Sequence, residues 1–373
     1  MLKVLHLIQG YGGGISSLVK NLILSADTTQ IKQDVMSFAY QDGELFVETL
    51  EKHGSRVYLM PRPRKEGYFT FKKYVIKIMQ EGMYDVVHCH TDGWRSTIYK
   101  KLAQKAEIPT FCIHAHRTSN NPGVIRNSRI YIKINQWISR KNADVRFTCG
   151  DEAAKFIYGT TKNVVTVPNG ISLERCHKAL LTDISKLKAE LAICDDEIVL
   201  LHAGRFVVQK NHMFMVNIAD ALRNKGIRFK LLLAGTGDLE SDVRKSVCEK
   251  GLLDKVIFLG RRDDIYELMM IADGMLLPSI SEGLPTVTVE AQAMGLHSLV
   301  SVNVSKECDF ELGLISFLPI YDTDIWVDII EKLKVPQDVP REKIEMTLKQ
   351  NAYTSYESCD RYISTLKDKL LLE

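Results

Sequence analysis

Residues 274–290 read GMLLPSISEGLPTVTVE, and this stretch decides the fold of the second half of the chain. The apolar run Gly274–Leu277 is typical of a short buried strand, and the proline, serines and glycine after it indicate a loop. Thr286–Met294 then has the apolar spacing of a helix. A buried strand, a loop and a helix in this order predict one unit of a parallel α/β sheet.

The same unit recurs along the whole chain. In the second half, predicted strands at 197–202, 229–234, 255–259 and 298–302 alternate with predicted helices at 212–224, 241–250 and 265–271. In the first half, predicted strands at 3–8, 85–89, 110–114, 145–149 and 164–167 alternate with predicted helices at 17–24, 71–80 and 96–106. A polar stretch at 172–196 joins the two halves. At the end of the chain, a last amphipathic helix is predicted at 362–371. We therefore predict an α/β protein of two doubly wound, Rossmann-like domains with an interdomain cleft, which meet at the turn tripeptide Pro168-Asn169-Gly170.

The composition of the 373 residues is that of a folded globular protein. Hydrophobic residues make up 45% and charged residues 25%, which excludes disorder, collagen-like repeats and coiled coils. No run of about 18 apolar residues occurs, so we predict no transmembrane helix. The apolar start is too short for a signal peptide, and the eight cysteines form no C-x-x-C pair. These features favour a cytoplasmic protein with reduced core thiols over one with disulfides or a metal site.

Charge is distributed unevenly, although the net charge is only +3. Residues 1–170 carry 24 basic and 14 acidic side chains, and the rest carry 25 and 32, so the two parts have net charges of +10 and −7. This asymmetry indicates that the first half faces an anionic partner, such as a membrane surface, a phosphorylated acceptor or nucleic acid. The alternative is that the two halves attract each other.

A glycine loop, Gly10 to Gly14, follows the first predicted strand and opens a helix. Such a loop either lets the backbone approach an anion at a helix N-terminus or forms a tight turn, and the sequence leaves both readings open. Its spacing is not the dinucleotide fingerprint G-x-G-x-x-G, because Ile15 stands at the third glycine position. A nicotinamide oxidoreductase is therefore disfavoured.

Two cations follow the first strand of the second half, in Gly204-Arg205-x4-Lys210. A guanidinium and an ammonium at the end of a parallel strand suit a diphosphate, and the alternative is two solvated surface cations. The glycine turn at 234–237 follows the next strand and can be purely structural.

Two glutamates frame the helix of the opening stretch, with Glu282 in the loop before it and Glu290 one to two turns inside it. Their carboxylates can accept hydrogen bonds from ligand hydroxyls on either side of a bound molecule. The helix N-terminus at Leu284, Pro285 and Thr286 lies between them and favours a phosphate.

In combination, these motifs resemble the retaining glycosyltransferases of family 4, which have the GT-B fold. The signature E-x7-E corresponds to Glu282 and Glu290, and G-R-x4-K, AG-x-G and PNG-[IV] occur before it in the family's order, the last as residues 168–171. The resemblance is strongest from 164 to 300. Residues 302–307 look like the version found in bacterial capsule and exopolysaccharide clusters. Ser172 departs from the pattern, which has an acidic residue after the PNG-[IV] element.

The resemblance implies a role for each matching residue. Arg205 and Lys210 would hold the diphosphate and stabilise the leaving nucleoside diphosphate, Glu290 would bind the ribose, and Glu282 would contact the transferred sugar. The remaining residues implied at the donor site are Gly13, Gly14, Gly204, Arg262, Gly283, Leu284, Pro285 and Thr286. It further implies an acceptor-side domain at 1–170, a nucleotide-sugar-binding domain at 171–350, and a C-terminal helix at 351–373 that packs back on the first domain.

Four histidines end predicted strands of the first half: His88, His90, His114 and His116. Either His114 or His116 corresponds to the catalytic strand-end histidine of the family, near the acceptor and the donor sugar. Some of the four would simply be buried strand-end residues. They could also suggest zinc, but no sequence signal makes four ligands converge, so we predict no metal.

The resemblance implies an enzyme that transfers a hexose or N-acetylhexosamine from a nucleoside diphosphate sugar, with UDP the expected nucleotide, to a hydroxyl of a glycan or lipid-linked acceptor. It implies no further cofactor, and we expect no nucleic-acid partner. The basic residues around 62–77 would contact an anionic membrane from the cytoplasmic side, or they form a solvated helix face. The alternatives to this function are a GT-B sugar-nucleotide epimerase and a non-catalytic nucleotide-sugar-binding subunit.

Overall fold

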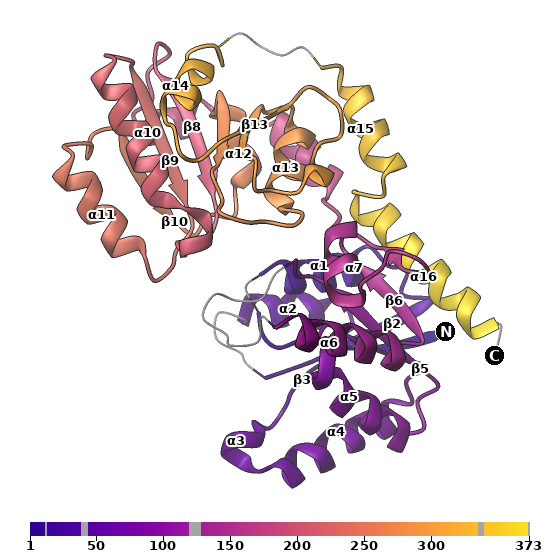
Figure 1. The fold of residues 1–373 in the computed structure, drawn as a ribbon. Coiled ribbons are helices and arrows are strands. Elements are labelled where there is room, and N and C mark those ends of the chain that lie inside the picture. The colour runs from indigo at the N-terminus through magenta and orange to yellow at the C-terminus, as the bar shows by residue number, and fades with distance from the viewer. Residues whose placement is uncertain (12, 39–43, 119–127, 335–338, 372–373) are drawn as a thin grey trace. The chain divides into compact units, whose positions relative to one another are not determined.

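A computed structural model describes residues 1–373 except 12, 39–43, 119–127, 335–338 and 372–373 (Figure 1). The chain forms two compact units, each with its own parallel sheet. Unit 1 comprises Met1–Ile171 and Ala352–Glu373, and unit 2 comprises Ser172–Asn351.

The sheet of unit 1 has the strand order β3-β2-β1-β4-β5-β6-β7, and all of its paired strands are parallel. Its strands are β1 (Leu2–Leu7), β2 (Ile31–Ser37), β3 (Val57–Leu59), β4 (Val86–Cys89), β5 (Thr110–Ala115), β6 (Val145–Thr148) and β7 (Val165–Thr166). The central strands are buried along most of their length, as expected for a parallel sheet covered by helices on both faces.

Helices from both ends of the sequence cover this sheet. They are α1 (Gly14–Leu24), α2 (Glu44–Lys52), α3 (Pro63–Glu66), α4 (Tyr68–Gly82), α5 (Gly93–Lys105), α6 (Arg129–Asn142), α7 (Asp151–Tyr158) and α16 (Ser355–Leu371). The C-terminal helix α16 belongs to this unit, because Tyr362 and Leu366 pack in one cluster with Val4 and Leu18. Backbone hydrogen bonds between Ile171 and Tyr353–Ser355 hold the start of this segment.

The sheet of unit 2 repeats the pattern, with the order β10-β9-β8-β11-β12-β13 and parallel pairing throughout. Its strands are β8 (Ile198–Ala203), β9 (Phe229–Ala234), β10 (Val256–Gly260), β11 (Gly274–Leu277), β12 (Ser298–Ser301) and β13 (Ile315–Leu318). Its helices are α8 (Leu173–Leu180), α9 (Ser185–Glu190), α10 (His212–Asn224), α11 (Glu240–Glu249), α12 (Ile265–Ile271), α13 (Thr286–Met294), α14 (Asp324–Ile330) and α15 (Arg341–Gln350), with 3₁₀ turns at Val208–Lys210 and Lys306–Cys308.

The predicted helices α10, α12 and α13 and the strand β11 have the bounds expected from the sequence. The polar stretch at 172–196 differs, because it contains α8 and α9 rather than a linker. Ser172, the departure from the family motif, accepts a hydrogen bond from the backbone N–H of Arg175 at 3.2 Å and so caps α8. Among the described residues, no helix is both long and apolar enough to cross a bilayer.

Candidate active site

The strand order of unit 2 reverses between β8 and β11, so the loops after these strands leave the same edge of the sheet as neighbours. Lys210, from the loop after β8, places its Nζ 2.6 Å from Oε1 of Glu282, from the loop after β11. The Nε2 of Gln209 donates to the Ser281 carbonyl at 2.6 Å, and the Ile280 N–H donates to the Gln209 carbonyl at 2.8 Å. The topology thus brings two of the predicted residues into direct contact.

The Lys210–Glu282 ion pair is mostly shielded from water, since the two side chains are 17% and 13% exposed. The Ser279 hydroxyl donates to the same Glu282 oxygen at 3.2 Å, and the Glu282 carbonyl accepts from the Ser305 N–H at 3.1 Å. Partial burial makes such an attraction stronger than on an open surface. The ammonium is therefore held in one place at the edge of the sheet where an anionic ligand would bind.

Arg205 lies one residue beyond Gly204 and is exposed. Within the part of the chain that the structure describes, its guanidinium has no ion pair, whereas Lys210 has Glu282. Of the two cations in the G-R-x4-K element, Arg205 is therefore the one whose charge the protein leaves uncompensated.

The AG-x-G glycines pack against this loop rather than against open space. Gly235 has a φ of +140°, and a Cβ there would overlap the carbonyl oxygen of Gly204. A Cβ on Gly237 would lie 2.6 Å from the Phe206 carbonyl oxygen. The Phe206 N–H also donates to the Thr236 carbonyl at 3.1 Å. These glycines consequently support the backbone that carries Arg205, which is the structural reading left open by the sequence.

Glu290 lies on α13 beside two side chains that the sequence did not single out. The Tyr266 hydroxyl donates to Glu290 Oε1 at 3.4 Å, and the Arg175 guanidinium stacks on the Tyr266 ring with 5.0 Å to its centroid. Burial of the carboxyl raises the pKa of Glu290 to about 7, and the positive charge of Arg175 opposes this rise. Glu290 is thus a carboxyl that exchanges its proton near neutral pH in the free protein.

The start of α13 offers backbone rather than side chains to a ligand. Leu284 is partly buried, and its side chain packs against the apolar cluster that contains Leu277 and Val300. Pro285 has no N–H, and both the hydroxyl and the N–H of Thr288 donate to its carbonyl, at 2.7 and 3.1 Å. Thr286 is the first residue of α13. A phosphate at this point would meet the backbone around Gly283 and Leu284.

Arg262, which the resemblance assigns to the donor site, forms ion pairs with carboxylates of the protein itself. Its Nε and Nη2 form a two-point contact with the Asp264 carboxylate at 2.7 and 2.5 Å, and its Nη1 lies 3.5 Å from Glu190. The hydrogen bonds to Asp264 raise the pKa of Arg262. A ligand would have to compete with these carboxylates for the side chain, so its backbone is the better candidate contact.

In unit 1, the sheet order reverses between β1 and β4, and the glycine loop follows β1. Gly13 is the N-cap of α1 in extended conformation, and a Cβ added to it would meet no described atom within 4 Å. A Cβ on Gly14 would lie 3.4 Å from Nδ2 of Asn169, which donates to the Gly14 carbonyl at 2.9 Å. The PNG-[IV] element therefore fixes the start of α1, and the space at Gly13 is open.

The four predicted histidines lie together at the same edge of the unit 1 sheet. His88 and His114 are buried within β4 and β5, and His90 and His116 follow the ends of these strands. Nδ1 of His90 lies 2.8 Å from Nε2 of His116. A fifth histidine, His6 on β1, joins this group. Only His116 of the five is partly exposed.

The sequence reasoning missed His6, Arg175 and Tyr266, and it included Ser279 in a family motif without giving it a role. His6 could have been found from the sequence. In a doubly wound sheet the first strand lies beside the strand of His88, and residues two apart on a strand, such as His88 and His90, share one face. Nothing in the sequence indicates that Tyr266 and Arg175 lie beside Glu290.

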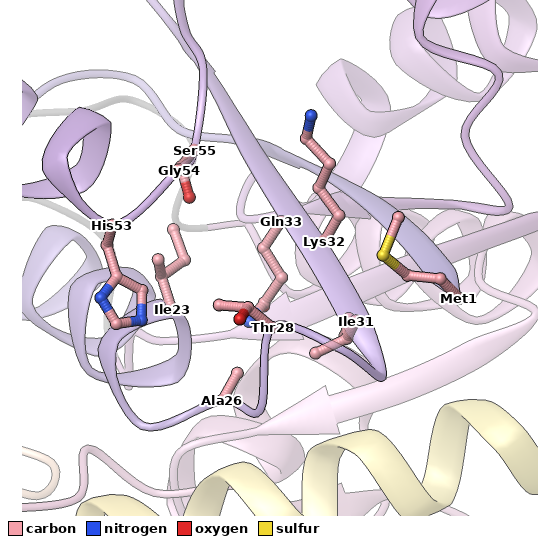
Figure 2. Close-up of a pocket in the computed structure, with 10 residues that line it drawn as sticks. All are labelled: Met1, Ile23, Ala26, Thr28, Ile31, Lys32, Gln33, His53, Gly54 and Ser55. Carbon is pink, nitrogen blue, oxygen red and sulfur yellow. The ribbon is translucent and has the colours of Figure 1, made fainter.

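A separate small pocket of about 140 Å³ lies in unit 1 where β2 begins (Figure 2). Met1, Ile31, Gln33, His53 and Ser55 are among its lining residues. Because it lies at the amino-terminal end of β2, it is not at the carboxyl edge where ligands of parallel sheets bind.

Family models match both halves of the chain. The model described as Glycosyltransferase Family 4 matches residues 12–175, and the model described as Glycosyl transferases group 1 matches residues 183–309. A Bacillus subtilis protein assigned as the glycosyltransferase EpsF is 31% identical over 379 residues, with 98% of each chain covered. The chain belongs to this family of glycosyltransferases, as the sequence motifs predicted.

Two further proteins extend the comparison. The UDP-Gal:α-D-GlcNAc-diphosphoundecaprenol α-1,3-galactosyltransferase of Escherichia coli is 23% identical over 267 residues, covering 69% of this chain and 68% of its own. The crystal structure of HepE from Anabaena in complex with UDP superposes with a TM-score of 0.78 at 16% identity, covering 99% and 100% of the chains. HepE has also been solved with UDP-glucose. The structural match confirms the predicted GT-B fold, and the family match confirms that the protein is a glycosyltransferase.

Proposed function

We propose that this glycosyltransferase transfers a hexose or N-acetylhexosamine from a UDP-sugar to a hydroxyl of a glycan or lipid-linked acceptor, with retention of the anomeric configuration, in the synthesis of a surface polysaccharide. The observation that carries the proposal is the Lys210–Glu282 pair at the strand reversal of unit 2. The UDP complexes of HepE and the lipid diphosphate in the name of the E. coli relative support the choice of donor and acceptor.

On the donor side, the cations of the G-R-x4-K element meet the diphosphate. Arg205 brings an uncompensated guanidinium, and Lys210 brings an ammonium that Glu282 orients. As the bond between the sugar C1 and the phosphate oxygen breaks, negative charge builds up on the departing UDP, and cations already in place stabilise it without reorganisation. The Glu282 carboxylate remains available to accept a hydrogen bond from a hydroxyl of the transferred sugar.

In this proposal, Glu290 accepts hydrogen bonds from the ribose hydroxyls. A carboxylate accepts hydrogen bonds better than a carboxylic acid, so donor binding is favoured when Glu290 has lost its proton. Arg175 supplies the positive charge that stabilises this ionised form.

The transfer itself occurs on one face of the sugar. The acceptor oxygen forms its bond to C1 on the side from which UDP departs, and the acceptor proton passes to the leaving phosphate oxygen. Retention by this route needs no protein nucleophile, which agrees with the family resemblance. Neither a metal nor another cofactor takes part in the proposed reaction.

A basic and aromatic surface of unit 1 fits a membrane-bound acceptor. We define the α3–α4 patch as Arg62, Arg64, Lys65, Tyr68, Phe69, Lys72 and Lys73. Phe69 is 82% exposed and Tyr68 47%. Lys72 lies close enough to Lys105 to lower the pKa of Lys105, so cations are crowded here. We propose that this patch meets the anionic cytoplasmic face of a membrane, where each cation contributes about 1 kcal/mol of binding.

The experiment that tests the function is a donor screen followed by product analysis. Purified protein is mixed with UDP-, GDP- and ADP-sugars, and release of nucleoside diphosphate is followed with undecaprenyl-diphosphate sugars as acceptors. The proposal expects a UDP-sugar to react, and NMR of the product to show the anomeric configuration of the donor. An inverted product refutes retention, and conversion of the donor without an acceptor supports the epimerase alternative instead.

A further inference from the structure

Five histidine rings form a layer inside unit 1. His6 on β1 pairs in register with His88 on β4, and His90 follows two residues after His88 on the same face. His114 on β5 and His116 just beyond it repeat this spacing one strand away. Neighbouring rings lie with centroids 4.3 to 5.6 Å apart. The catalytic set uses at most one or two of these rings, so the others require an explanation.

One hydrogen-bonded chain runs from Gln33 to His116. Gln33 Oε1 lies 2.9 Å from His6 Nε2, His6 Nδ1 lies 3.3 Å from His90 Nε2, and His90 Nδ1 lies 2.8 Å from His116 Nε2. The orientation of the Gln33 amide is fixed, because its Nε2 donates to the Leu22 carbonyl at 2.8 Å, and a carbonyl can only accept.

The direction of every bond in this chain follows from Gln33. Since the Gln33 oxygen can only accept, His6 must carry its proton on Nε2 and leave Nδ1 as an acceptor. His90 must then donate from Nε2 and accept at Nδ1, and His116 must donate from Nε2. The lone pair of His116 is consequently on Nδ1, for which the described residues provide no hydrogen-bond partner.

A second chain ends inside the protein. The Tyr362 hydroxyl lies 2.9 Å from His88 Nδ1, and His88 Nε2 lies 3.3 Å from His114 Nδ1. A buried phenol with this one partner donates its hydrogen bond to it, so His88 accepts at Nδ1, carries its own proton on Nε2 and donates from there to His114 Nδ1. His114 then carries its own proton on Nε2, which is buried. His114 therefore offers no outward lone pair, and His116 does.

The rings are uncharged, as these assignments require. Burial lowers the pKa of His88, His90 and His114 well below the usual value. It lowers the pKa of His6 to about 4 and that of His116 to about 3.

We propose that Gln33, His6 and His90 are positioning residues that lock His116 in its Nε2–H tautomer, so that Nδ1 of His116 accepts a hydrogen bond from a hydroxyl of the sugar substrate. The part that concerns the sugar hydroxyl rests on the proposed function. The chain does not conduct protons, because it ends at an amide oxygen that cannot accept one permanently. It sets the polarity of His116 and selects a donor group, a hydroxyl, over an acceptor.

The same histidines include two groups of three, His6 with His88 and His90, and His90 with His114 and His116, whose nitrogens are close enough for a metal ion. In the first group, His6 Nδ1 and His90 Nε2 already lie at hydrogen-bond distance from each other, and in the second group the ring planes argue against this use. An imidazole binds a metal along its lone pair, in the plane of the ring. The His114 and His116 rings are stacked with centroids 4.4 Å apart and planes inclined by 18°, so one ion cannot lie in both planes. His90 and His116 point nitrogens at each other at hydrogen-bond distance.

The test uses two substitutions at Gln33 and reads the tautomer directly. In Gln33→Met the acceptor is lost at similar volume, His6 gains nothing by carrying its proton on Nε2, and the chain is free to reverse. In Gln33→Glu we expect burial to keep the new carboxyl protonated, so that it donates to the Leu22 carbonyl, still accepts from His6 and keeps the order. Gln136→Met is the matched control, because Gln136 donates to carbonyls of α7 and is remote from the histidines in its bonding.

The measurement is the pair of ¹⁵N shifts of His116, assigned with a His116→Gln spectrum, together with kcat/KM for transfer. We expect wild type, Gln33→Glu and Gln136→Met to carry the His116 proton on Nε2. In Gln33→Met we expect a large Nδ1–H population and about a tenfold lower kcat/KM. A wild-type His116 protonated on Nδ1, an unchanged tautomer in Gln33→Met, or stoichiometric zinc in the purified protein refutes the lock. Should the tautomer shift as expected but His116→Gln retain full activity, the lock stands and the role of His116 in the proposed function fails.

Discussion

Lys210→Met tests the ion pair at the proposed donor site. The substitution keeps much of the stem of Lys210 and removes its ammonium, so Glu282 loses a partner 2.6 Å away and retains the Ser279 hydroxyl at 3.2 Å. The Glu282 side chain is only 13% exposed, so solvent replaces the lost partner poorly.

The expected size of the effect follows from this partial burial. Breaking a fully buried pair costs about 3–5 kcal/mol, and an exposed pair contributes about 0–1 kcal/mol. We therefore expect a loss of about 2 kcal/mol in the free energy of unfolding. Turnover should fall further, by roughly 10²- to 10³-fold, because a preorganised charge at the departing diphosphate is lost while the carboxylate remains to repel it.

The assay separates stability from catalysis with a second substitution and a control. Urea unfolding and transfer rates are measured for Lys210→Met, Glu282→Gln and the double variant. The double variant should recover part of the lost stability, since no unpaired carboxylate remains, but none of the lost turnover. Lys225→Met is the control, because Lys225 pairs with Asp328 at 2.9 Å on an exposed surface of the same unit. Turnover of Lys210→Met within threefold of wild type would refute the reasoning.

Three further predictions follow from other parts of the structure. Glu290 has a pKa of about 7 in the folded protein and an ordinary value of 4.5, so between these pH values the folded state holds a proton that the unfolded state releases, and the free energy of unfolding falls as pH rises. In thermal unfolding, Glu290→Gln should therefore gain stability relative to wild type from pH 4.5 to 7. A difference that stays constant with pH would contradict the raised pKa. Gly235→Ala should lower the free energy of unfolding in urea by about 3 kcal/mol, because Gly235 has a φ of +140° and an added Cβ would clash with the Gly204 carbonyl. Gly226→Ala, at an open position with a φ of +73°, is the control and should cost about 1 kcal/mol. Equal losses in the two variants would refute the packing role of Gly235. Replacing the five cations of the α3–α4 patch with Gln should reduce sedimentation with anionic liposomes at low salt and leave UDP binding unchanged, and equal sedimentation of both proteins would show that the patch is only solvated.

The doubly wound fold could be predicted because most strands are apolar runs bounded by turn residues. The strand β2 escaped prediction, since Lys32, Gln33 and Asp34 interrupt its apolar pattern. Gln33 and Asp34 are nevertheless buried, because each has partners that only the folded sheet supplies. Asp34 accepts from the Tyr84 hydroxyl at 2.7 Å. Buried polar residues with distant partners cannot be distinguished from loop residues in a single sequence.

The candidate site was predicted in its residue types but not in its contacts. The motifs indicated that Arg205 and Lys210 meet an anion, but not that Lys210 is paired with Glu282 while Arg205 has no ion pair among the described residues. Burial raises the pKa of Glu290, and the neighbours that oppose this rise come from α8 and α12, a proximity that depends on helix packing. Similarly, the sequence could not distinguish His114 from His116, because the distinction depends on hydrogen bonds that begin at Gln33 and Tyr362.

The central claim, a UDP-sugar donor held by unit 2, is tested most directly by calorimetric titration of UDP into wild type, Arg205→Ala and the control Arg228→Ala. Arg228 is an exposed arginine of the same unit that pairs with Asp196. We expect UDP to bind wild type and Arg228→Ala with the same affinity, to bind more tightly than GDP or ADP, and to bind Arg205→Ala at least tenfold more weakly. Equal UDP affinity in all three proteins, or tighter binding of another nucleoside diphosphate by wild type, would contradict the account.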